Sequence, residues 1–484
     1  MTFTDLERIA SFDSTTRNDQ RFDGQFYSAV MTTGIFCRPG CPGKPRAENV
    51  RFFSTAAAAA ESGFRPCLRC HPESAPDPPE WHATSPVVAR ALRLIGEGAL
   101  DDGGVTELAG LLSVSARQLQ RLFVEELGAP PVAVAQTRRL LFAKKLIDET
   151  DLSMTEIAFS AGYSSVRRFN EALKQTYART PSDLRRKRRR SSANPSSATI
   201  ELKLFYRNPY NWPAMLAFLS QHAMPLVETV DRTTYRRTIQ IGDVQGVISV
   251  RPLCDKRAVL LRVPADFSRF LLPITERVKQ IFDLKADPAA IAEDLSRNHA
   301  MIELLEKHPG VRLPGCWEGF DATVNAIVRR AYGDRSKKLL TDLVEGFGTA
   351  YTDSGHPGLT RLFPTPEQLV TAPLEEVGIP AHMSDSIRGL AGLVARGAIS
   401  FDGGVDFREF ADQLRKLPGV DDHVVPYVAL RTLGQPDLDL SCNSLIFACV
   451  GDAMSSPVPD DSAWQSYAGM TRWAATRSRS FVTA

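Results

Sequence analysis

The spacing of apolar residues changes character along the 484-residue chain. Residues 85–190 repeat them at the three-to-four-residue spacing of amphipathic helices. Residues 199–308 contain strict alternation at 201–206 and 244–250, which is typical of strands, with helical patterns between and after them. From residue 309 onward the pattern is almost entirely helical. We therefore expect a multidomain, mainly α protein that includes one α+β domain.

The helical stretch 85–190 contains one arrangement twice: a short helix, a tight turn and a second helix with a basic outer face. The second helices are predicted at 115–123 and 165–174, and Ser115 is of the type that caps a helix N-terminus. A helix around 137–149 joins the two pairs. This pattern predicts a double helix-turn-helix domain, whose second helices enter the DNA major groove. The side chains expected to reach bases or phosphates are Gln118, Arg121, Arg167 and Arg168.

The charge distribution favours a nucleic-acid partner for this stretch. Residues 82–190 carry 18 Lys and Arg against 12 Asp and Glu, whereas residues 191–484 carry 31 against 34. The net charge of +2 for the whole chain therefore hides a basic front part. The alternative is a helical bundle that binds protein, which the basic excess disfavours. Because no run of about 18 apolar residues occurs, no membrane span is predicted.

Four of the eight cysteines form two close pairs near the N-terminus, Cys37 with Cys41 and Cys67 with Cys70. This spacing lets two short turns present four thiolates to one zinc ion in a tetrahedron. The alternatives are ordinary reduced thiols or two disulfides of a secreted module. The polar start of the chain does not look like a signal peptide, so we expect a reducing, cytoplasmic setting and one zinc ion.

The segment around the cysteine pairs, including residues 26–36 and 63–66, resembles the zinc domain of the adaptive-response (Ada) proteins over its whole length. The resemblance implies a small zinc-bound α+β domain in which Cys37 accepts a methyl group from a DNA phosphotriester and keeps it. The supporting ligands would be Cys41, Cys67 and Cys70. The charge fits this chemistry, because four thiolates on a divalent ion carry an excess of two negative charges, which keeps a sulfur nucleophilic.

Basic side chains crowd the same segment. We expect them to hold DNA phosphates near the sulfur, the alternative being a solvated surface. Those nearest the acceptor in sequence are Arg38, Lys44 and Arg46. The double helix-turn-helix stretch, which closes with residues 177–185, resembles the DNA-binding domain of AraC-type activators. The two resemblances together imply a protein that reads DNA methylation damage and then binds promoters.

Residues 199–484 carry, in order, four landmarks of AlkA-type 3-methyladenine DNA glycosylases. The landmarks are residues 209–213, 313–316, 363–367 and 417–419. The resemblance implies an α+β domain followed by an all-α helix-hairpin-helix domain, which would hold DNA and excise a flipped-out base.

Three functional positions of that family differ here. The DNA-holding hairpin has Asp421 where the family has a second glycine, and Asp422 follows it. A carboxylate about 5 Å from a phosphate costs up to about 3 kcal/mol at an effective dielectric constant of 20. Ala331 stands where the family inserts an apolar wedge into the DNA. The catalytic Asp aligns with Asn443, which carries no charge to stabilise the sugar cation.

We therefore expect the glycosylase-like half to have lost most or all base excision. In the alternative interpretation Asp439 or Asp437 supplies the missing charge, and the chain is a bifunctional repair enzyme with an active 3-methyladenine glycosylase. A further alternative is a pure transcription factor with a structural zinc. No Pro-Cys-His-Arg motif occurs, so guanine-methyl repair is not expected.

The favoured hypothesis is an alkylation sensor that is both a stoichiometric methyltransferase and an activator of repair genes. Its expected partners are double-stranded DNA, with a methylated backbone or a promoter sequence, and RNA polymerase. We expect it at the nucleoid and not at a membrane. The predicted domains are the methyl acceptor at 1–78, the helix-turn-helix domain at 84–190, the α+β domain at 199–308 and the glycosylase-like domain at 309–484.

Overall fold

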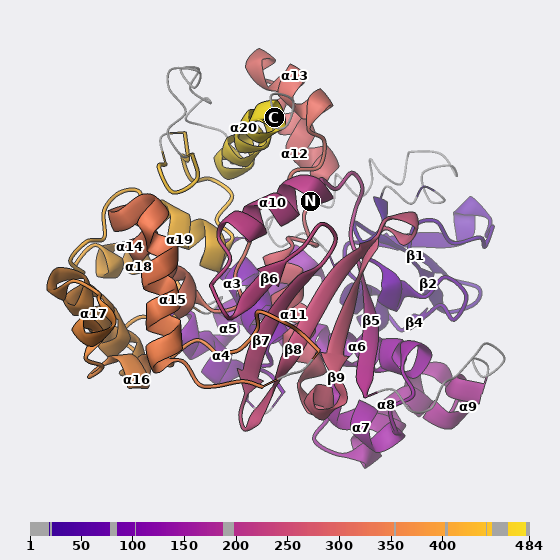
Figure 1. The fold of residues 1–484 in the computed structure, drawn as a ribbon. Helices are drawn as coiled ribbons and strands as arrows, with labels where there is room; N and C mark the ends of the chain where they lie inside the picture. Colours follow the sequence, from indigo (N-terminus) through magenta and orange to yellow (C-terminus); the bar gives the residue numbers. More distant parts are fainter. Residues whose placement is uncertain are drawn as a thin grey trace. The chain divides into compact units, whose positions relative to one another are not determined.

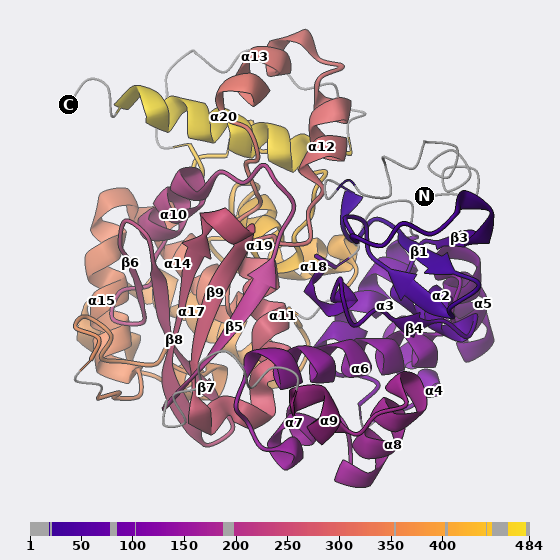
Figure 2. The same ribbon diagram turned by 90° about the vertical axis from the view of Figure 1, so that its right-hand side faces the viewer.

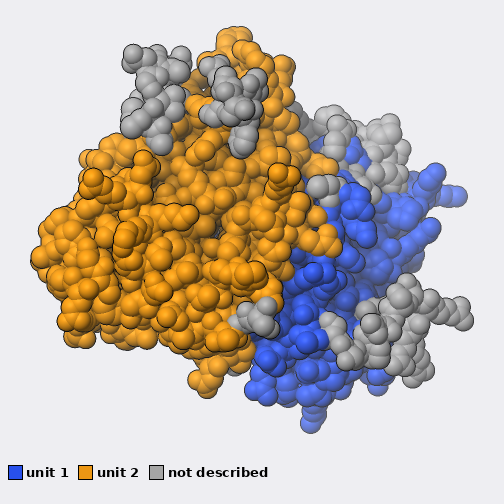
Figure 3. Space-filling model, in the orientation of Figure 1, with its two compact units in different colours: residues 1–207, 253–276 blue, residues 208–252, 277–484 orange. Residues whose placement is uncertain are grey.

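The computed structural model describes the larger part of the chain, which divides into two compact units (Figures 1 and 3). Unit 1 comprises residues 1–207 and 253–276, and unit 2 comprises residues 208–252 and 277–484. The chain therefore leaves the first unit and returns to it. The described residues are 19, 22–77, 85–101, 103–186, 198–352, 355–401, 405–441, 443–447 and 463–480.

A small four-stranded sheet begins unit 1, in the order β3-β1-β2-β4 (Figure 2). Its strands are β1 (Tyr27–Val30), β2 (Ile35–Cys37), β3 (Val50–Phe53) and β4 (Arg65–Pro66). The pairs are antiparallel except for β2 with β4, and Ser28 of β1 lies opposite Cys37. Helix α2 (Ala56–Glu61) begins where Thr55 Oγ1 accepts the Ala58 N–H at 3.0 Å. Its buried alanines pack against the sheet, which confirms the predicted small α+β domain.

The helical part of unit 1 has the predicted double helix-turn-helix design. The helices are α3 (Pro86–Glu97), α4 (Val105–Leu111), α5 (Ala116–Leu127), α6 (Pro131–Glu149), α7 (Met154–Ser160), α8 (Val166–Tyr177) and α9 (Pro181–Arg186). Helix α6 joins the pairs α4–α5 and α7–α8. Ser115 and Ser165 cap α5 and α8, each accepting the backbone N–H three residues on, at 3.1 and 3.2 Å. The inner face of α5 buries Leu119 and Phe123.

Two strands that follow the helices also belong to unit 1. β5 (Thr199–Phe205) and β9 (Ala258–Pro264) pair antiparallel along their whole length, with Phe205 opposite Ala258. The predicted alternation is confirmed, because Leu202 and Leu204 are buried between more exposed neighbours. A short helix, η6 (Ala265–Phe270), leads from β9 into α11 (Leu271–Ile281).

Unit 2 contains an antiparallel strand meander and most of the remaining helices. The strands are β6 (Glu228–Val230), β7 (Tyr235–Ile241) and β8 (Val244–Leu253). The helices are α10 (Trp212–Gln221), α12 (Pro288–Leu295), α13 (His299–Lys307), α14 (Gly319–Tyr332), α15 (Ser336–Phe347), α16 (Pro366–Leu369), α17 (Ala381–Ala395), α18 (Phe407–Leu414), α19 (Val424–Leu433) and α20 (Gln465–Ser480).

The core of unit 2 lies where α14 packs against α19, and most residues of both helices are buried. Helix α20 lies beside α13 (Figure 2). Among the described residues, none of the helices combines the length and the apolar content that a membrane span needs. The helix-rich arrangement of both units confirms the multidomain, mainly α class expected from the sequence.

Candidate metal centre and nucleic-acid interface

The four cysteines of the front domain come together around one point. Cys37 ends β2 and Cys41 follows in the next turn, while the second pair lies in the turn after β4. The four Sγ atoms all lie within 4.8 Å of one another. A tetrahedral zinc ion with bonds of about 2.3 Å holds its sulfurs about 3.8 Å apart. The donor set and its spacing therefore fit one zinc ion.

The four cysteines differ in exposure. Cys41, Cys67 and Cys70 are buried, whereas Cys37 is half-buried. The backbone N–H of Arg69 donates a hydrogen bond to Cys67 Sγ at 3.3 Å, which supports negative charge on that sulfur. Cys37 is thus the least buried residue of the four, although the cluster itself is buried.

The crowding of the thiols shifts their acidity in opposite directions. Hydrogen bonds, first of all with Cys37, lower the pKa of Cys41 to about 6 and hold the pKa of Cys67 well below its usual range. The pKa values of Cys37 and Cys70 are raised, mainly by hydrogen bonds with Cys41 and Cys37 respectively. Four thiols this close cannot all ionise without a cation among them, and a bound divalent ion would deprotonate the set.

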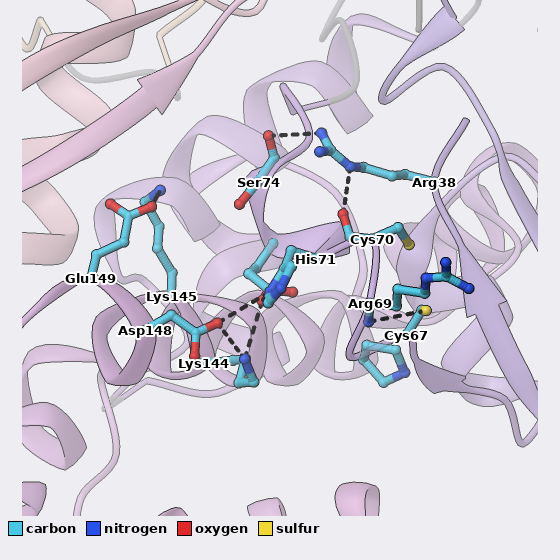
Figure 4. A network of polar contacts seen from close by, with 12 residues as sticks. Arg38, Cys67, Arg69, Cys70, His71, Ser74, Lys144, Lys145, Asp148 and Glu149 are labelled. Atoms are coloured by element: carbon cyan, nitrogen blue, oxygen red, sulfur yellow. Dashed lines mark hydrogen bonds and ion pairs between the residues drawn. The ribbon is translucent and has the colours of Figure 1, made fainter. Parts of the chain in front are cut away.

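Arg38, expected to hold a phosphate, makes its contacts inside the domain (Figure 4). Its Nε donates to the Cys70 carbonyl at 2.8 Å, and its Nη1 donates to Asp23 Oδ2 at 2.5 Å and to the Ser74 carbonyl at 3.3 Å. The guanidinium therefore ties the strand that carries Cys37 to the segment of the second cysteine pair. Lys44 and Arg46, in contrast, are exposed.

The predicted DNA-reading side chains all lie on the outer faces of the second helices. Gln118 and Arg121 of α5 and Arg167 and Arg168 of α8 are exposed. The contacts of the three arginines are within their own helix or at its start, to Glu125 at 3.8 Å, Glu171 at 2.9 Å and Ser164 at 3.1 Å. Surface contacts of this kind contribute little to stability, so a phosphate can replace them at low cost.

A polar cluster beside the cysteines was not predicted. His71 directly follows Cys70, and its Nδ1 lies 2.9 Å from Glu73 Oε1 and 3.2 Å from Asp148 Oδ2 of α6 (Figure 4). Lys144 of α6 hydrogen bonds to both carboxylates. Hydrogen bonds to Asp148 and Glu73 raise the pKa of His71 to about 9. From the sequence, only the i,i+4 pair of Lys144 and Asp148 on α6 could have been predicted. Its partners, His71 and Glu73, lie about seventy residues earlier in the chain.

In the glycosylase-like half, the hairpin that precedes α19 is closed by its own aspartate. Asp421 Oδ1 accepts the backbone N–H groups of His423 at 3.0 Å and Val424 at 3.1 Å, where α19 begins. Arg330 Nε donates to Asp421 Oδ2 at 2.6 Å. Although burial acts to raise it, these hydrogen bonds hold the pKa of Asp421 below its usual value. The backbone N–H groups at the start of α19 are therefore already bound by a carboxylate.

The structure also places Asn443 and Ala331, the other two positions at which this chain differs from the glycosylase family. Asn443 is 4 % exposed; its Nδ2 donates to the His423 carbonyl at 2.8 Å, and its Oδ1 accepts the Leu445 N–H at 3.0 Å. Ala331 lies exposed in the last turn of α14, not in a loop as the alignment suggested. The alternative carboxylates Asp437 and Asp439 are exposed.

A four-cysteine metal centre, a double helix-turn-helix and a glycosylase-like half define a three-part protein of the DNA alkylation response. Family models agree with this division: the metal binding domain of Ada matches residues 11–73, a helix-turn-helix domain matches 108–187, and the AlkA N-terminal domain matches 201–318. The chain is 36% identical to the probable bifunctional transcriptional activator/DNA repair enzyme AlkA of Mycobacterium tuberculosis, over 97% of this chain and 96% of that protein. The chain belongs to this family of bifunctional Ada/AlkA proteins.

Two further relatives each match one half. The bifunctional transcriptional activator/DNA repair enzyme AdaA of Bacillus subtilis is 32% identical over 35% of this chain and 78% of its own length. DNA-3-methyladenine glycosylase 2 of Escherichia coli is 27% identical over 50% of this chain and 84% of its own length. These matches confirm the resemblances stated for the sequence, and the helix-turn-helix domain makes DNA a partner of this chain.

Proposed function

We propose that this chain is a DNA alkylation sensor whose methyl acceptor is Cys37. Zinc held by Cys37, Cys41, Cys67 and Cys70 would supply the positive charge that keeps all four sulfurs ionised. The Cys37 sulfur then forms a bond to the methyl carbon of a phosphotriester while the bond from that carbon to the phosphate oxygen breaks. The leaving group is an ordinary phosphodiester anion, so no proton or further reactant is needed. The observation that carries the proposal is the gathering of four sulfurs within 4.8 Å of one another, among which Cys37 is the least buried residue.

Methylation would change the charge of the site. One negative charge disappears from the cluster, so its repulsion of the DNA backbone falls. Exposed Lys44 and Arg46 would hold phosphates beside the acceptor, while Arg38 positions the cysteine segments through its internal hydrogen bonds. The double helix-turn-helix would then bind promoters of repair genes and bring RNA polymerase to them.

The acceptor is tested by mass spectrometry after exposure to methylated DNA. Trypsin does not cut before proline, and Pro39 and Pro45 follow Arg38 and Lys44, so one peptide of residues 22–46 carries both candidate acceptors. Fragmentation of this peptide should locate the added methyl on Cys37. A Cys37→Ser protein should take up none, and a methyl on Cys41 would overturn the assignment.

The switch is tested by promoter affinity. The methylated protein should bind the promoter more tightly than the unmethylated protein, and both affinities should fall steeply with salt. An unchanged affinity would contradict the switch and leave methyl transfer standing. A zinc-dependent fold without any methyl uptake would instead favour a transcription factor with a structural metal.

We further propose that the glycosylase-like half no longer excises bases. Three observations support this. The Asp421 carboxylate occupies the hairpin N–H groups, the Asn443 amide is committed to two backbone partners, and Ala331 is too small to fill the place of a flipped base. The first two are contacts that a working site would have to break.

The test is release of 3-methyladenine from alkylated duplex DNA by the purified chain, beside a working AlkA-type enzyme. We expect no release above the level of buffer alone. Release at an ordinary enzymatic rate would overturn the proposal, and Asp439→Asn and Asp437→Asn would then show which carboxylate carries the reaction.

A further inference from the structure

Arg207, the second residue after β5, donates hydrogen bonds to the methyl-acceptor domain. Its side chain is buried, with 4 % of the residue exposed. Nε donates to the Asp23 carbonyl at 2.9 Å, and Nη2 donates to the carbonyls of Asp77 at 2.8 Å and Pro76 at 3.5 Å. One guanidinium therefore joins the first and the last described segments of that domain.

Glycine at position 24 makes this approach possible. Its φ is +78°, and a Cβ there would lie 2.0 Å from the Pro76 carbonyl oxygen and 2.5 Å from Arg207 Nη2. Any side chain would push the two segments and the guanidinium apart. Next to it, the Asp23 carboxylate holds Arg38, which in turn binds the Cys70 carbonyl. Three successive contacts thus connect Arg207 to the backbone of a predicted zinc ligand.

Strand β5 also binds the helix-turn-helix domain. The Lys203 backbone N–H donates to Glu149 Oε2 of α6 at 2.9 Å. Lys145 Nζ lies 5.2 Å from the centroid of the Phe205 ring, and it also pairs with Glu149 at 2.9 Å. After β9, the Ser268 carbonyl accepts the Ser160 hydroxyl of α7 at 2.5 Å.

The third contact is the one between the cysteine segment and α6, through His71, Glu73, Lys144 and Asp148 (Figure 4). The cysteine domain, α6 and β5 therefore touch one another pairwise. Three parts in mutual contact form a contiguous network, through which a change at one can be transmitted to the other two.

We propose that β5, with Arg207 as its main anchor, is a working part of the methylation sensor, although it lies in the stretch matched by the AlkA N-terminal domain. It fixes the cysteine domain against α6, so that the charge change at Cys37 alters the DNA affinity of both helix-turn-helix pairs. This inference rests on the proposed sensor function. It gives the glycosylase-like sequence a task that needs no base excision.

The experiment compares the full-length chain with Arg207→Ala, Arg207→Lys and Glu149→Ala. Arg207→Lys keeps the charge but replaces the guanidinium fork with a single nitrogen, and Glu149→Ala removes the hydrogen bond between β5 and α6 without touching the cysteine domain. The matched control is Arg262→Ala on β9, because Arg262 makes only an exposed pair with Glu201 at 2.8 Å among its described contacts. Zinc content, methyl uptake and promoter affinity before and after methylation are measured for each protein.

We expect every variant to keep zinc and methyl uptake. The ratio of promoter affinities, methylated over unmethylated, should fall toward one in the Arg207 and Glu149 variants and stay at the natural value in Arg262→Ala. A natural ratio in Arg207→Lys and Glu149→Ala would overturn the proposal.

Amide hydrogen exchange tests the anchoring role of Arg207 without depending on a change in promoter affinity. The Ser74 and Ala75 N–H groups bond to the carbonyls of His71 and Pro72, within the segment that Arg207 fastens. They should exchange at least tenfold faster in Arg207→Ala than in the natural protein, and unchanged exchange would refute the anchor. If the natural protein shows no affinity change on methylation, the sensor function fails, and the exchange result alone decides whether β5 anchors the domain.

Discussion

The cysteine cluster of unit 1 and the hairpin of unit 2 both correspond to sites that act on DNA in related proteins. They differ in how far their polar groups are already satisfied by hydrogen bonds within the chain. In the cluster, four sulfurs point at one place, and the nearby Arg38 binds carbonyls and a carboxylate, leaving the sulfurs to a metal. In the hairpin, the Asp421 carboxylate accepts the N–H groups at the start of α19, and after α19 the Asn443 amide donates to the His423 carbonyl.

This difference shows why a conserved fold is weak evidence for activity. A binding or catalytic site keeps hydrogen-bonding or ligating capacity that the folded chain itself does not satisfy. The four sulfurs of the cluster offer such capacity, whereas the N–H groups at the start of α19 are satisfied by Asp421, although the surrounding helices α14 and α19 pack as a well-formed core.

The largest expected effect is that of metal removal on the first site. Structural zinc sites supply about 10–16 kcal/mol of apparent binding free energy, which is largely folding free energy. Zinc chelation or Cys41→Ala should therefore abolish hydrogen-exchange protection across residues 22–77. Tryptophan fluorescence should hardly change, because four of the five tryptophans lie in unit 2. Protection that persists in protein shown to be metal-free would contradict the zinc assignment.

The second prediction concerns removal of the Asp421 carboxylate from the hairpin. Asp421→Gly removes the carboxylate from the N–H groups of His423 and Val424, so nonspecific DNA should bind about tenfold more tightly, or about 1.4 kcal/mol. Arg121→Ala and Arg168→Ala in the same chain reduce binding by the front domain, and fluorescence anisotropy at low salt measures the affinity.

Asp422→Gly is the control for this experiment. It removes the same charge, but its side chain is 91% exposed and contacts Arg415 at 3.5 Å, away from the N–H groups. An equal gain for both variants would mean that net charge, and not the occupied hairpin, limits DNA binding.

The third prediction concerns Asn443→Asp. The aspartate cannot donate to the His423 carbonyl and places negative charge against it, so the free energy of unfolding should fall by about 1–3 kcal/mol. Urea unfolding followed by tryptophan fluorescence measures the change, and Asp439→Asn, at an exposed position, should stay within about 0.5 kcal/mol of the natural protein. Asn443→Asp protein that releases 3-methyladenine would show that the missing charge alone silenced the site.

The smallest effect is a pH dependence of unit 2. Burial raises the pKa of Asp321 to about 6, against the attraction of Arg237. Because the folded state binds this proton more tightly than the unfolded state does, Asp321 adds stability below pH 6 and the contribution is lost as the pH rises through 6. The natural protein should gain about 1 kcal/mol from Asp321 between about pH 7.5 and about pH 5.

Asp321→Asn should remove this gain, whereas Asp412→Asn, which alters an exposed carboxylate paired with Arg415, should leave it unchanged. If the free energy of unfolding in urea depends on pH in the same way for all three proteins, the pKa of Asp321 is not raised by burial.

Much of this comparison could be predicted from the sequence because its signals are local. The cysteine spacing predicts four sulfurs at one point, and Ser115 predicts the start of α5. The alignment also indicated that Asp421 and Asn443 replace functional residues. The hydrogen bonds of Asp421 onto α19 are local, but its contact with Arg330, about ninety residues away, could not be predicted.

The contacts that join the parts of unit 1 could not be predicted from the sequence for the same reason. Arg207 binds carbonyls at least 130 residues away in sequence, at Asp23, Pro76 and Asp77, and backbone carbonyls leave no trace in a sequence pattern. His71 and Asp148 likewise belong to no motif. A single sequence shows which residues can make such bonds, but not which partners the fold brings to them.

Unit 1 is assembled from two separate stretches of the chain, residues 1–207 and 253–276. A gene for such a protein cannot be divided into two intact halves at a single position. A break before residue 253 takes β9 away from β5, and a break after 276 leaves residues 208–252 without the rest of unit 2. Exchange of either stretch of this chain for that of another protein would therefore separate β9 from β5 or divide unit 2.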